Sequence, residues 1–228
     1  LELATTTQAP ALQALADAST DWDGHASVGS TGYRLVQDWR AAVHERIALG
    51  LFAPARAALG DDFTMPPLAQ LEGVAWPLAT QRPAHLLPRG HADWSALFED
   101  AAASVRAELE PQGPLAERSW GERNTARICH PLAAAVPGPL RTGLCMPADP
   151  LPGDNHMPRV QAPAMGASQR MVVAPGREAE GIIHQPGGQS GHPLSPFWGA
   201  GHADWVQGRP SPFLPGPPQH SLVLRPGR

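Results

Sequence analysis

The most informative stretch of the sequence reads Pro186-Gly187-Gly188-Gln189-Ser190-Gly191-His192-Pro193-Leu194-Ser195-Pro196. Glycine and proline recur throughout this stretch, and both residue types mark turns. The whole chain shares this character, because 27 prolines and 23 glycines occur among its 228 residues, well above the usual share. We therefore expect much of the backbone to lie in loops around a core of ordinary size.

The hydroxyl of Ser190 raises the question of whether this stretch is catalytic. Its spacing is close to the Gly-x-Ser-x-Gly pattern of a nucleophile elbow, but that pattern requires glycine where His192 stands and a long buried strand before it. The glycines do not form a phosphate-binding P-loop either, since that loop needs a lysine after its last glycine. Ser190 is therefore predicted to be a turn residue.

Charge and composition exclude several function classes. The formal net charge is −4 and all seventeen basic residues are arginines, so the basic patch of a nucleic-acid-binding protein is not expected. The sequence has no apolar run of the ~20 residues that cross a membrane. Ten histidines occur without metal-site spacing, and we expect no metal ion in this chain. Cys129 and Cys145 are predicted to be two buried thiols, with a bridge between them as the alternative.

The first half of the sequence predicts helices. Apolar side chains spaced by three and four predict one helix over residues 32–49, capped by Ser30 or Thr31 and stopped by Gly50. A second helix is predicted to begin at Pro66-Pro67 and to be ended or kinked by Pro77. A third is predicted over residues 93–109, with Asp93 as its cap. The apolar positions of the first are Tyr33, Val36, Trp39, Val43 and Ile47, and those of the third are Trp94, Leu97, Phe98, Ala101, Val105 and Leu109.

After Pro114 the sequence consists of short runs of strand-forming residues separated by glycines and prolines. The predicted strands lie at residues 124–130, 157–161, 166–173, 181–185 and 221–225. In residues 166–173, Ala167, Met171 and Val173 share the face that we expect to be buried, and Ser168 and Arg170 share the other. The sequence thus predicts an α+β chain with a mainly helical segment at 1–113 and a strand- and loop-rich segment at 114–228.

Several motifs occur in an order that is typical of one family. They are Trp22-Asp23-Gly24, Trp120-Gly121-Glu122-Arg123-Asn124 with His130-Pro131-Leu132, Gly153-Asp154-Asn155-His156-Met157-Pro158-Arg159-Val160-Gln161, Gly166-Ala167-Ser168-Gln169-Arg170-Met171-Val172-Val173, and the Gly187–Pro196 part of the opening stretch. In this order they resemble the C-terminal part of the β chain of penicillin acylases. A departure follows Pro196, where many members continue with histidine, tyrosine, aspartate and glutamine but this chain has Phe197-Trp198-Gly199-Ala200.

The resemblance implies an N-terminal-nucleophile hydrolase with an αββα sandwich, of which this chain is the C-terminal portion. In that family a serine at the β-chain N-terminus attacks an N-acyl amide, with its own α-amine as base. Leu1 has no hydroxyl or thiol, so no catalytic residue is expected in this chain, which alone should be inactive. Calcium ligands, where members have them, lie upstream. The implied partners are the upstream β-chain portion, the α chain and a small N-acyl substrate, in the periplasm or outside the cell.

Five polar residues of the C-terminal segment are candidates for holding the active-site residues in position without contacting the substrate themselves. For Gln189 and His192, fixing a tight turn through backbone hydrogen bonds is the favoured interpretation. Arg159 and Arg170 are expected to form ion pairs within the larger protein. The five candidates are Asp154, Arg159, Gln161, Gln189 and His192.

Two functions are compatible with these observations. The leading hypothesis is the C-terminal part of an acylase that cleaves an N-acyl group from a β-lactam nucleus or a related amide. The alternative is a proline-rich binding or interaction module on an acylase-like scaffold without catalysis. The two differ in whether a serine, threonine or cysteine at a self-cleavage junction belongs to the same polypeptide.

Overall fold

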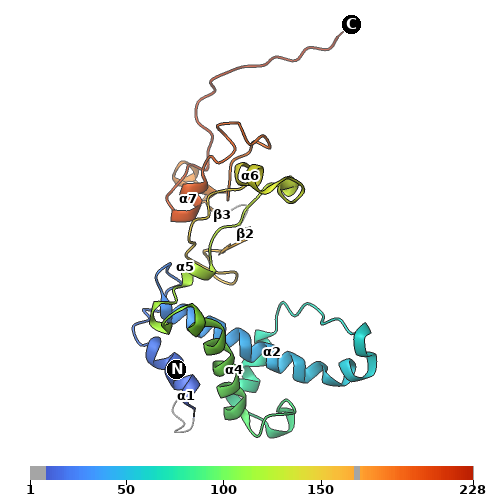
Figure 1. Ribbon diagram of the computed structural model, residues 1–228. Coiled ribbons are helices and arrows are strands. Elements are labelled where there is room, and N and C mark those ends of the chain that lie inside the picture. The colour runs from blue at the N-terminus through green and yellow to red at the C-terminus, as the bar shows by residue number, and fades with distance from the viewer. Residues whose placement is uncertain (1–8, 167–169, 228) are drawn as a thin grey trace. The chain divides into compact units, whose positions relative to one another are not determined.

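A computed structural model describes residues 9–166 and 170–227 and shows an α+β chain (Figure 1). The chain forms two compact units, and the boundary between them lies between Arg123 and Asn124. The sequence changes character earlier, at Pro114. The α-helices are α1 Pro10–Ala18, α2 Thr31–Leu59, α3 Glu72–Gln81, α4 Trp94–Leu109, α5 Trp120–Arg123, α6 Gly138–Arg141 and α7 His202–Gln207. Short 3₁₀ turns are η2 Gly60–Asp62, η3 Ala84–Leu86, η4 Glu110–Gln112, η5 Leu115–Glu117, η6 Pro131–Ala135, η7 Thr142–Leu144 and η8 Glu178–Glu180. The strands are β1 Gln161–Ala162, β2 Met165–Gly166, β3 Arg170–Val172 and β4 Ile182–His184.

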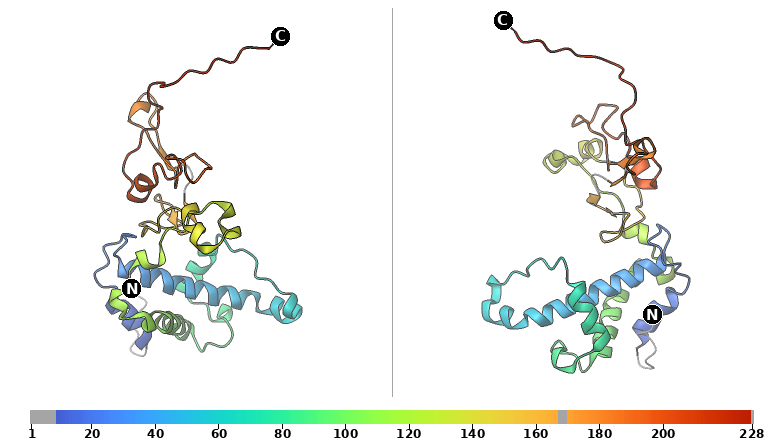
Figure 2. Two further views of the ribbon diagram at one scale, coloured as in Figure 1. Left: turned by 45° about the horizontal axis from the view of Figure 1, so that its top comes forward. Right: turned by 180° about the vertical axis from the view of Figure 1, so that it is seen from behind.

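The core of the first unit lies where α1, α2 and α4 pack together (Figure 2). The helix predicted over residues 93–109 is confirmed as α4, and the Asp93 side chain caps it by accepting the Ala96 N–H at 2.8 Å. All six of its predicted apolar positions are buried. On α2 the predicted stripe is only partly right, because Leu35 is fully buried while Tyr33, Val36 and Trp39 are half-buried.

Helix α2 begins as predicted but continues past its expected end. The hydroxyl of Ser30 accepts the Tyr33 N–H and caps the helix. Gly50 does not stop it, because it lies inside the helix where the ring of Pro88 packs at a distance that a side chain would not allow. The helix instead runs through Pro54 to Leu59 and ends at Gly60, whose φ of +57° favours glycine.

The prediction for the second helix was wrong about its start. Pro66 and Pro67 precede α3, which begins at Glu72 after a turn. Pro77 lies inside α3 and does not end it. The carbonyl of Gly73, which loses its helical donor to Pro77, is on the exposed side, where water can bind it.

Helix α1 was not predicted from the sequence. Its first N–H groups have no local cap; instead, the Glu99 carboxylate of α4 accepts hydrogen bonds from Ala11 and Leu12 at 2.7 and 2.9 Å. A carboxylate at a helix N-terminus also interacts favourably with the helix dipole. The helix is therefore stabilised by a contact across the unit, and only Pro10 followed by Leu12 and Leu15 marked it in the sequence.

The second unit begins with two extended segments that run antiparallel, residues 124–130 and 144–151. Hydrogen bonds link Met146 to Ile128 and His130 to Leu144, but the pairing remains a set of isolated bridges instead of the predicted strand. Pro147 and Pro150 lack the N–H groups that a continuous ladder requires. Between the segments Cys129 and Cys145 form a disulfide, so the prediction of two thiols was wrong and the alternative is correct.

The named strands form two short antiparallel pairs, β1 with β2 and β3 with β4. They overlap the predicted strands at 157–161, 166–173 and 181–185. The prediction that Met171 lies on a buried face was wrong: Met171 and Val172 are both exposed, and the partly buried side chain of β3 is Arg170. Residues 167–169, which include Ala167 and Ser168, lie outside the described residues.

No strand forms at residues 221–225. This segment is extended and points away from the rest of its unit (Figure 2), with Leu222 and Leu224 each 85% exposed. Its apolar sequence favours a strand, but within the described residues no neighbouring strand supplies hydrogen bonds to it.

An ion pair between α2 and α4 makes the first unit sensitive to acid. The guanidinium of Arg46 donates to the Asp100 carboxylate at 2.6 Å, and the ring of His91 lies 3.4 Å from the same oxygen. The Arg46 hydrogen bond, helped by His91, holds the pKa of Asp100 below its ordinary value. A carboxyl group with a lowered pKa stabilises the fold above its unfolded-state pKa, and this contribution is lost as the pH falls through the folded-state pKa.

We predict that Asp100→Asn lowers the free energy of unfolding at neutral pH by less than about 1 kcal/mol, because water screens this half-exposed pair. The difference from the unchanged chain should vanish in acid, which urea unfolding at a series of pH values would measure. Asp61→Asn, in an exposed turn, serves as the control and should have no effect. A difference that persisted after Asp100 is protonated would contradict this assignment.

Candidate functional site

The polar residues of the second unit converge on the C-terminal end of α7. The last carbonyl groups of a helix have no donor within the helix and need one from elsewhere. Here the amide of Gln161, which is fully buried, donates to the Trp205 carbonyl at 2.8 Å. The guanidinium of Arg159 donates to the Val206 carbonyl at 2.6 Å and to the Gln161 side-chain oxygen at 2.7 Å. Arg159 and Gln161 thus cap α7 as a pair.

Arg170 adds a third donor to the same helix end. Its Nη2 donates to the Trp205 carbonyl at 2.5 Å, and its guanidinium lies 5.9 Å from the centre of the Trp205 ring. Its Nε donates to Nδ1 of His184, which leaves Nε2 of His184 to donate to the Arg209 carbonyl. Within the described residues both guanidinium groups bond to a helix end, which carries a partial negative charge. The ion pairs expected of Arg159 and Arg170 within the larger protein stay a prediction.

Two residues that the sequence did not single out complete this arrangement. The buried amide of Asn124 donates to the carbonyls of Leu151, Gly153 and Gln161 and so joins three separate segments. At the other end of α7, Nδ1 of His202 bonds to the Pro186 carbonyl at 2.5 Å, and its Nε2 lies 3.3 Å from the Asp149 carboxylate. Asn124 is the last residue of the motif that begins at Trp120, and this was the one signal available.

Asp154 is buried near this cluster in a turn. Its side chain accepts the N–H of Asn155 at 2.7 Å, and its backbone bridges to Val160. Gly153 beside it has a φ of +85°, and an added Cβ would lie 2.2 Å from the Arg159 carbonyl. The Gly153-Asp154 turn therefore brings the chain back so that Arg159 and Gln161 reach α7.

The opening stretch of the sequence folds into a compact series of turns. The Gly188 N–H donates to the Trp198 carbonyl at 2.8 Å, and the His192 carbonyl accepts the Ser195 N–H at 2.9 Å. At Gly188 an added Cβ would lie 1.6 Å from the Phe197 carbonyl oxygen, so only glycine fits. The close approach of these two backbone segments explains why residue 188 is glycine.

Gln189 and His192 lie on this turn, apart from the cap of α7. Both are exposed: the Gln189 amide bonds to the Gln185 side chain, and Nδ1 of His192 accepts the Leu194 N–H. The hydroxyl of Ser190 accepts the His192 N–H at 3.1 Å. The contacts of His192 and Ser190 match the turn-fixing role and the turn position predicted for them, whereas the Gln189 side chain bonds to another side chain and not to the backbone.

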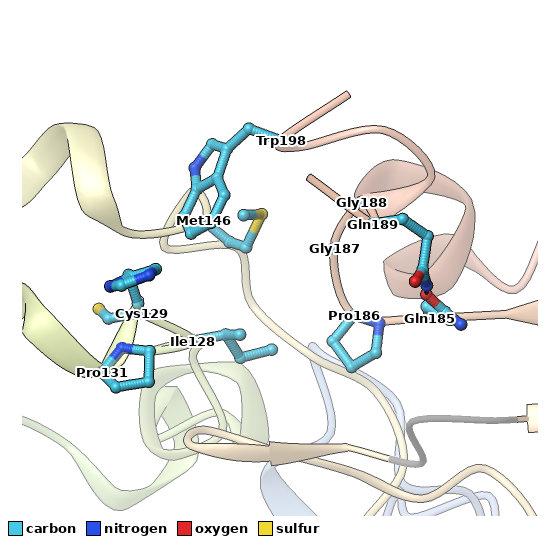
Figure 3. A pocket seen from close by; sticks show the side chains of 11 residues that line it. Ile128, Cys129, Pro131, Met146, Gln185, Pro186, Gly187, Gly188, Gln189 and Trp198 are labelled. Atoms are coloured by element: carbon cyan, nitrogen blue, oxygen red, sulfur yellow. Dashed lines mark hydrogen bonds between the residues drawn. The ribbon is translucent and has the colours of Figure 1, made fainter. Parts of the chain in front are cut away.

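A pocket of about 460 Å³ lies beside the turn (Figure 3). Cys129 and Pro131 line one side of it, Gly187 and Gly188 line the facing side, and Trp198 covers it with Met146. Its volume suits a small ligand. Its lining is mostly apolar, with His130, Gln185 and Gln189 as the polar side chains, so it can bind through hydrogen bonds and apolar contact.

These residues provide structural support, and the pocket offers room for a small ligand. Ser190 does not line the pocket, and within residues 9–166 and 170–227 no histidine side chain is hydrogen-bonded to its hydroxyl, as a serine nucleophile would require. In the same part of the chain no three histidine, cysteine, aspartate or glutamate side chains come together as a metal site.

We predict that Gln161→Leu lowers the free energy of unfolding by about 1–3 kcal/mol, because the Trp205 carbonyl and Nε of Arg159 lose a buried partner. Gln189→Leu is the matched control; its side chain is exposed, and the change should stay within about 0.5 kcal/mol. Urea unfolding followed by tryptophan fluorescence would measure both. Equal effects would show that Gln161 does not hold α7.

A second pair of variants tests the turn. Gly188→Ala forces a Cβ against the Phe197 carbonyl and should cost about 1–3 kcal/mol, as overpacking does. At Gly191 the space around an added Cβ is open, so Gly191→Ala should leave the melting temperature nearly unchanged. If Gly188→Ala melts like Gly191→Ala, the two backbone segments do not approach as described.

None of the described helices is both long and apolar enough to cross a bilayer. Among curated proteins, no match to the chain was found. The model of the penicillin amidase family, in contrast, matches residues 2–219, which include the cap of α7 and the glycine-rich turn. A match of this extent confirms the resemblance, and the chain belongs to the penicillin amidase family.

Proposed function

We propose that this chain is the C-terminal part of the β chain of a penicillin amidase-type hydrolase, which cleaves the N-acyl amide bond of a β-lactam or a related compound. The observation that carries the proposal is the family match over residues 2–219. Members of this family are hydrolases that act on amides. The motifs of the cap and the turn lie within the match and have defined structural roles here.

The catalytic groups in this proposal come from another segment. A serine at the β-chain N-terminus attacks the amide carbonyl, and its free α-amine takes the proton, giving an acyl-enzyme that water hydrolyses. Backbone and asparagine donors stabilise the oxyanion. The described residues contribute by holding their segments in place: Asn124, Gln161 and Arg159 join the chain around α7.

The short strands support the proposal that this chain completes an αββα sandwich. Strand β4 has neighbours on both sides, because β3 pairs with one edge and residues Ser211 and Phe213 bond along the other. The outer edge of β3 is left open in the described part, beside the exposed side chains of Met171 and Val172. Two-stranded pairs of this size are marginal alone, and open apolar edges are normally covered.

The disulfide supports a periplasmic or secreted location. Disulfides persist in oxidising compartments and are rare in the cytosol. The Cys129–Cys145 bond closes a loop between two segments that are also joined by backbone hydrogen bonds. We propose that calcium, where present, is bound by the upstream β-chain portion, and that this portion, the α chain and the N-acyl substrate are the partners.

We predict that the purified 228-residue chain shows no hydrolysis of phenylacetyl or long-chain acyl amides. Expression together with an α chain and an upstream β-chain portion that begins with serine should restore turnover. Product release measured by amine detection would compare the two. Reproducible turnover by the chain alone would overturn the proposal, and a correctly assembled but inactive complex would favour the non-catalytic binding module.

Ser190 allows a sharper control in the assembled enzyme. Because its hydroxyl accepts a backbone N–H in a turn, Ser190→Ala should leave kcat within about twofold of the unchanged enzyme, well inside the 10²–10⁴-fold losses typical of a removed catalytic group. Alanine in place of the β-chain N-terminal serine should abolish turnover. The opposite pattern would place the nucleophile in this chain.

A further inference from the structure

Two arginines lie together at the end of α7 with their charges incompletely balanced. Arg159 and Arg170 donate to adjacent carbonyls, those of Val206 and Trp205. The two guanidinium groups are close enough that the charge of Arg159 lowers the pKa of Arg170, although burial is the larger cause for both residues. A guanidinium that is taken out of water normally has an anionic partner.

The buried Asp154 accepts the Asn155 N–H in its own turn, and the other acids of the second unit are occupied elsewhere or exposed. Asp149 faces His202, Asp204 pairs with Arg209, and Glu180 lies near Arg177. Of the ion pairs formed within residues 9–166 and 170–227, none includes Arg159 or Arg170. The C-terminal carbonyls of α7 offset only part of the two positive charges, because a helix end carries about half an elementary charge.

One donor of this pair has no acceptor. Nη1 of Arg170 is shielded from solvent, and among the described residues no hydrogen-bond acceptor faces it. Its neighbours on the same guanidinium are satisfied, since Nη2 bonds to the Trp205 carbonyl and Nε to His184. Leaving a buried charged donor without an acceptor costs more than leaving a neutral one.

We propose that Arg159 and Arg170 form a binding site for a small carboxylate, which accepts hydrogen bonds from Nη1 of Arg170 and neutralises the pair. A carboxylate matches the planar edge of a guanidinium and makes short, charge-assisted hydrogen bonds. Two sources share this chemistry: a free acetate-like acid, or an aspartate or glutamate side chain from a segment packed against the unit. The site does not depend on the amidase proposal.

The atoms that shield Nη1 of Arg170 from solvent limit the size of the ligand. Because no surface of this atom is open, a carboxylate enters only with a small local displacement, and a compact group does so most easily. Formate and acetate should therefore bind, whereas benzoate should not. Inorganic phosphate, which needs more donors and more room, should bind less tightly than acetate.

Acetate titration of the 228-residue chain tests the proposal. With ¹⁵N-labelled arginine, the Nε–H signals of Arg159 and Arg170 should shift together and saturate, at constant ionic strength with chloride as the reference ion. The half-saturating acetate concentration should rise at least about tenfold in Arg170→Met, which removes the charged donors. Arg177→Met, at an exposed turn, is the matched control and should bind acetate like the unchanged chain.

If Arg170→Met does not fold, Arg170→Lys takes its place, because it keeps a positive charge at this position. Lysine lacks the planar donor edge, so weakened acetate binding with an intact melting transition still supports the site. The proposal is wrong if acetate produces no saturable shift of either arginine, if Arg177→Met weakens binding as much as Arg170→Met, or if phosphate binds more tightly than acetate.

Adding the upstream polypeptide distinguishes the two sources. If a side chain of that polypeptide occupies the site, the arginine signals should already be shifted and acetate should have no further effect. If the natural occupant is a free acid, acetate should bind to the assembled protein as it does to the chain. Unshifted arginine signals that acetate does not move in the assembly would show that the site is absent from the protein.

Discussion

The second unit depends on one constraint, the need of the C-terminal carbonyl groups of α7 for hydrogen-bond donors. Trp205 is fully buried, so water cannot satisfy its carbonyl. Gln161 and Arg170 donate to it, and Arg159 donates to the next carbonyl. Since these donors come from separate strands and turns, the cap of a two-turn helix holds the whole unit together. A small apolar core alone would not do so, because it comprises little more than Ala126, Leu151, Trp205 and Val206.

The first unit is stabilised in a different way. Long amphipathic helices bury a continuous apolar cluster, in which Leu35 of α2 and Leu97 and Phe98 of α4 are almost completely enclosed. Polar contacts between helices, such as Glu99 with α1 and Arg46 with Asp100, orient the helices around that cluster. The unit therefore derives its stability mainly from apolar burial, and hydrogen bonds between distant segments matter more in the second unit.

This difference clarifies the meaning of the family motifs. The polar motif residues Arg159, Gln161 and Gln189 could have been read as parts of an active site. The first two donate to a buried helix end and the third lies on an exposed turn, so the contacts that they make here are structural. The hydrolase chemistry is indicated by family membership and not by the contacts of these residues.

The sequence by itself determined the α+β character, the family, and the helix α4 with its Asp93 cap, because periodicity, capping residues and ordered motifs are local features. It also indicated that Ser190 and His192 belong to a turn. Only the tertiary structure decided the features that depend on distant contacts. Gly50 lies within a helix because Pro88 packs against it, α1 forms because Glu99 caps it, and Cys129 reaches Cys145 because two extended segments pair. The burial of Gln161 and the closeness of the charges of Arg159 and Arg170 also depend on distant contacts. Their partners lie on α7, more than forty residues from Gln161, and no local pattern reports such a contact.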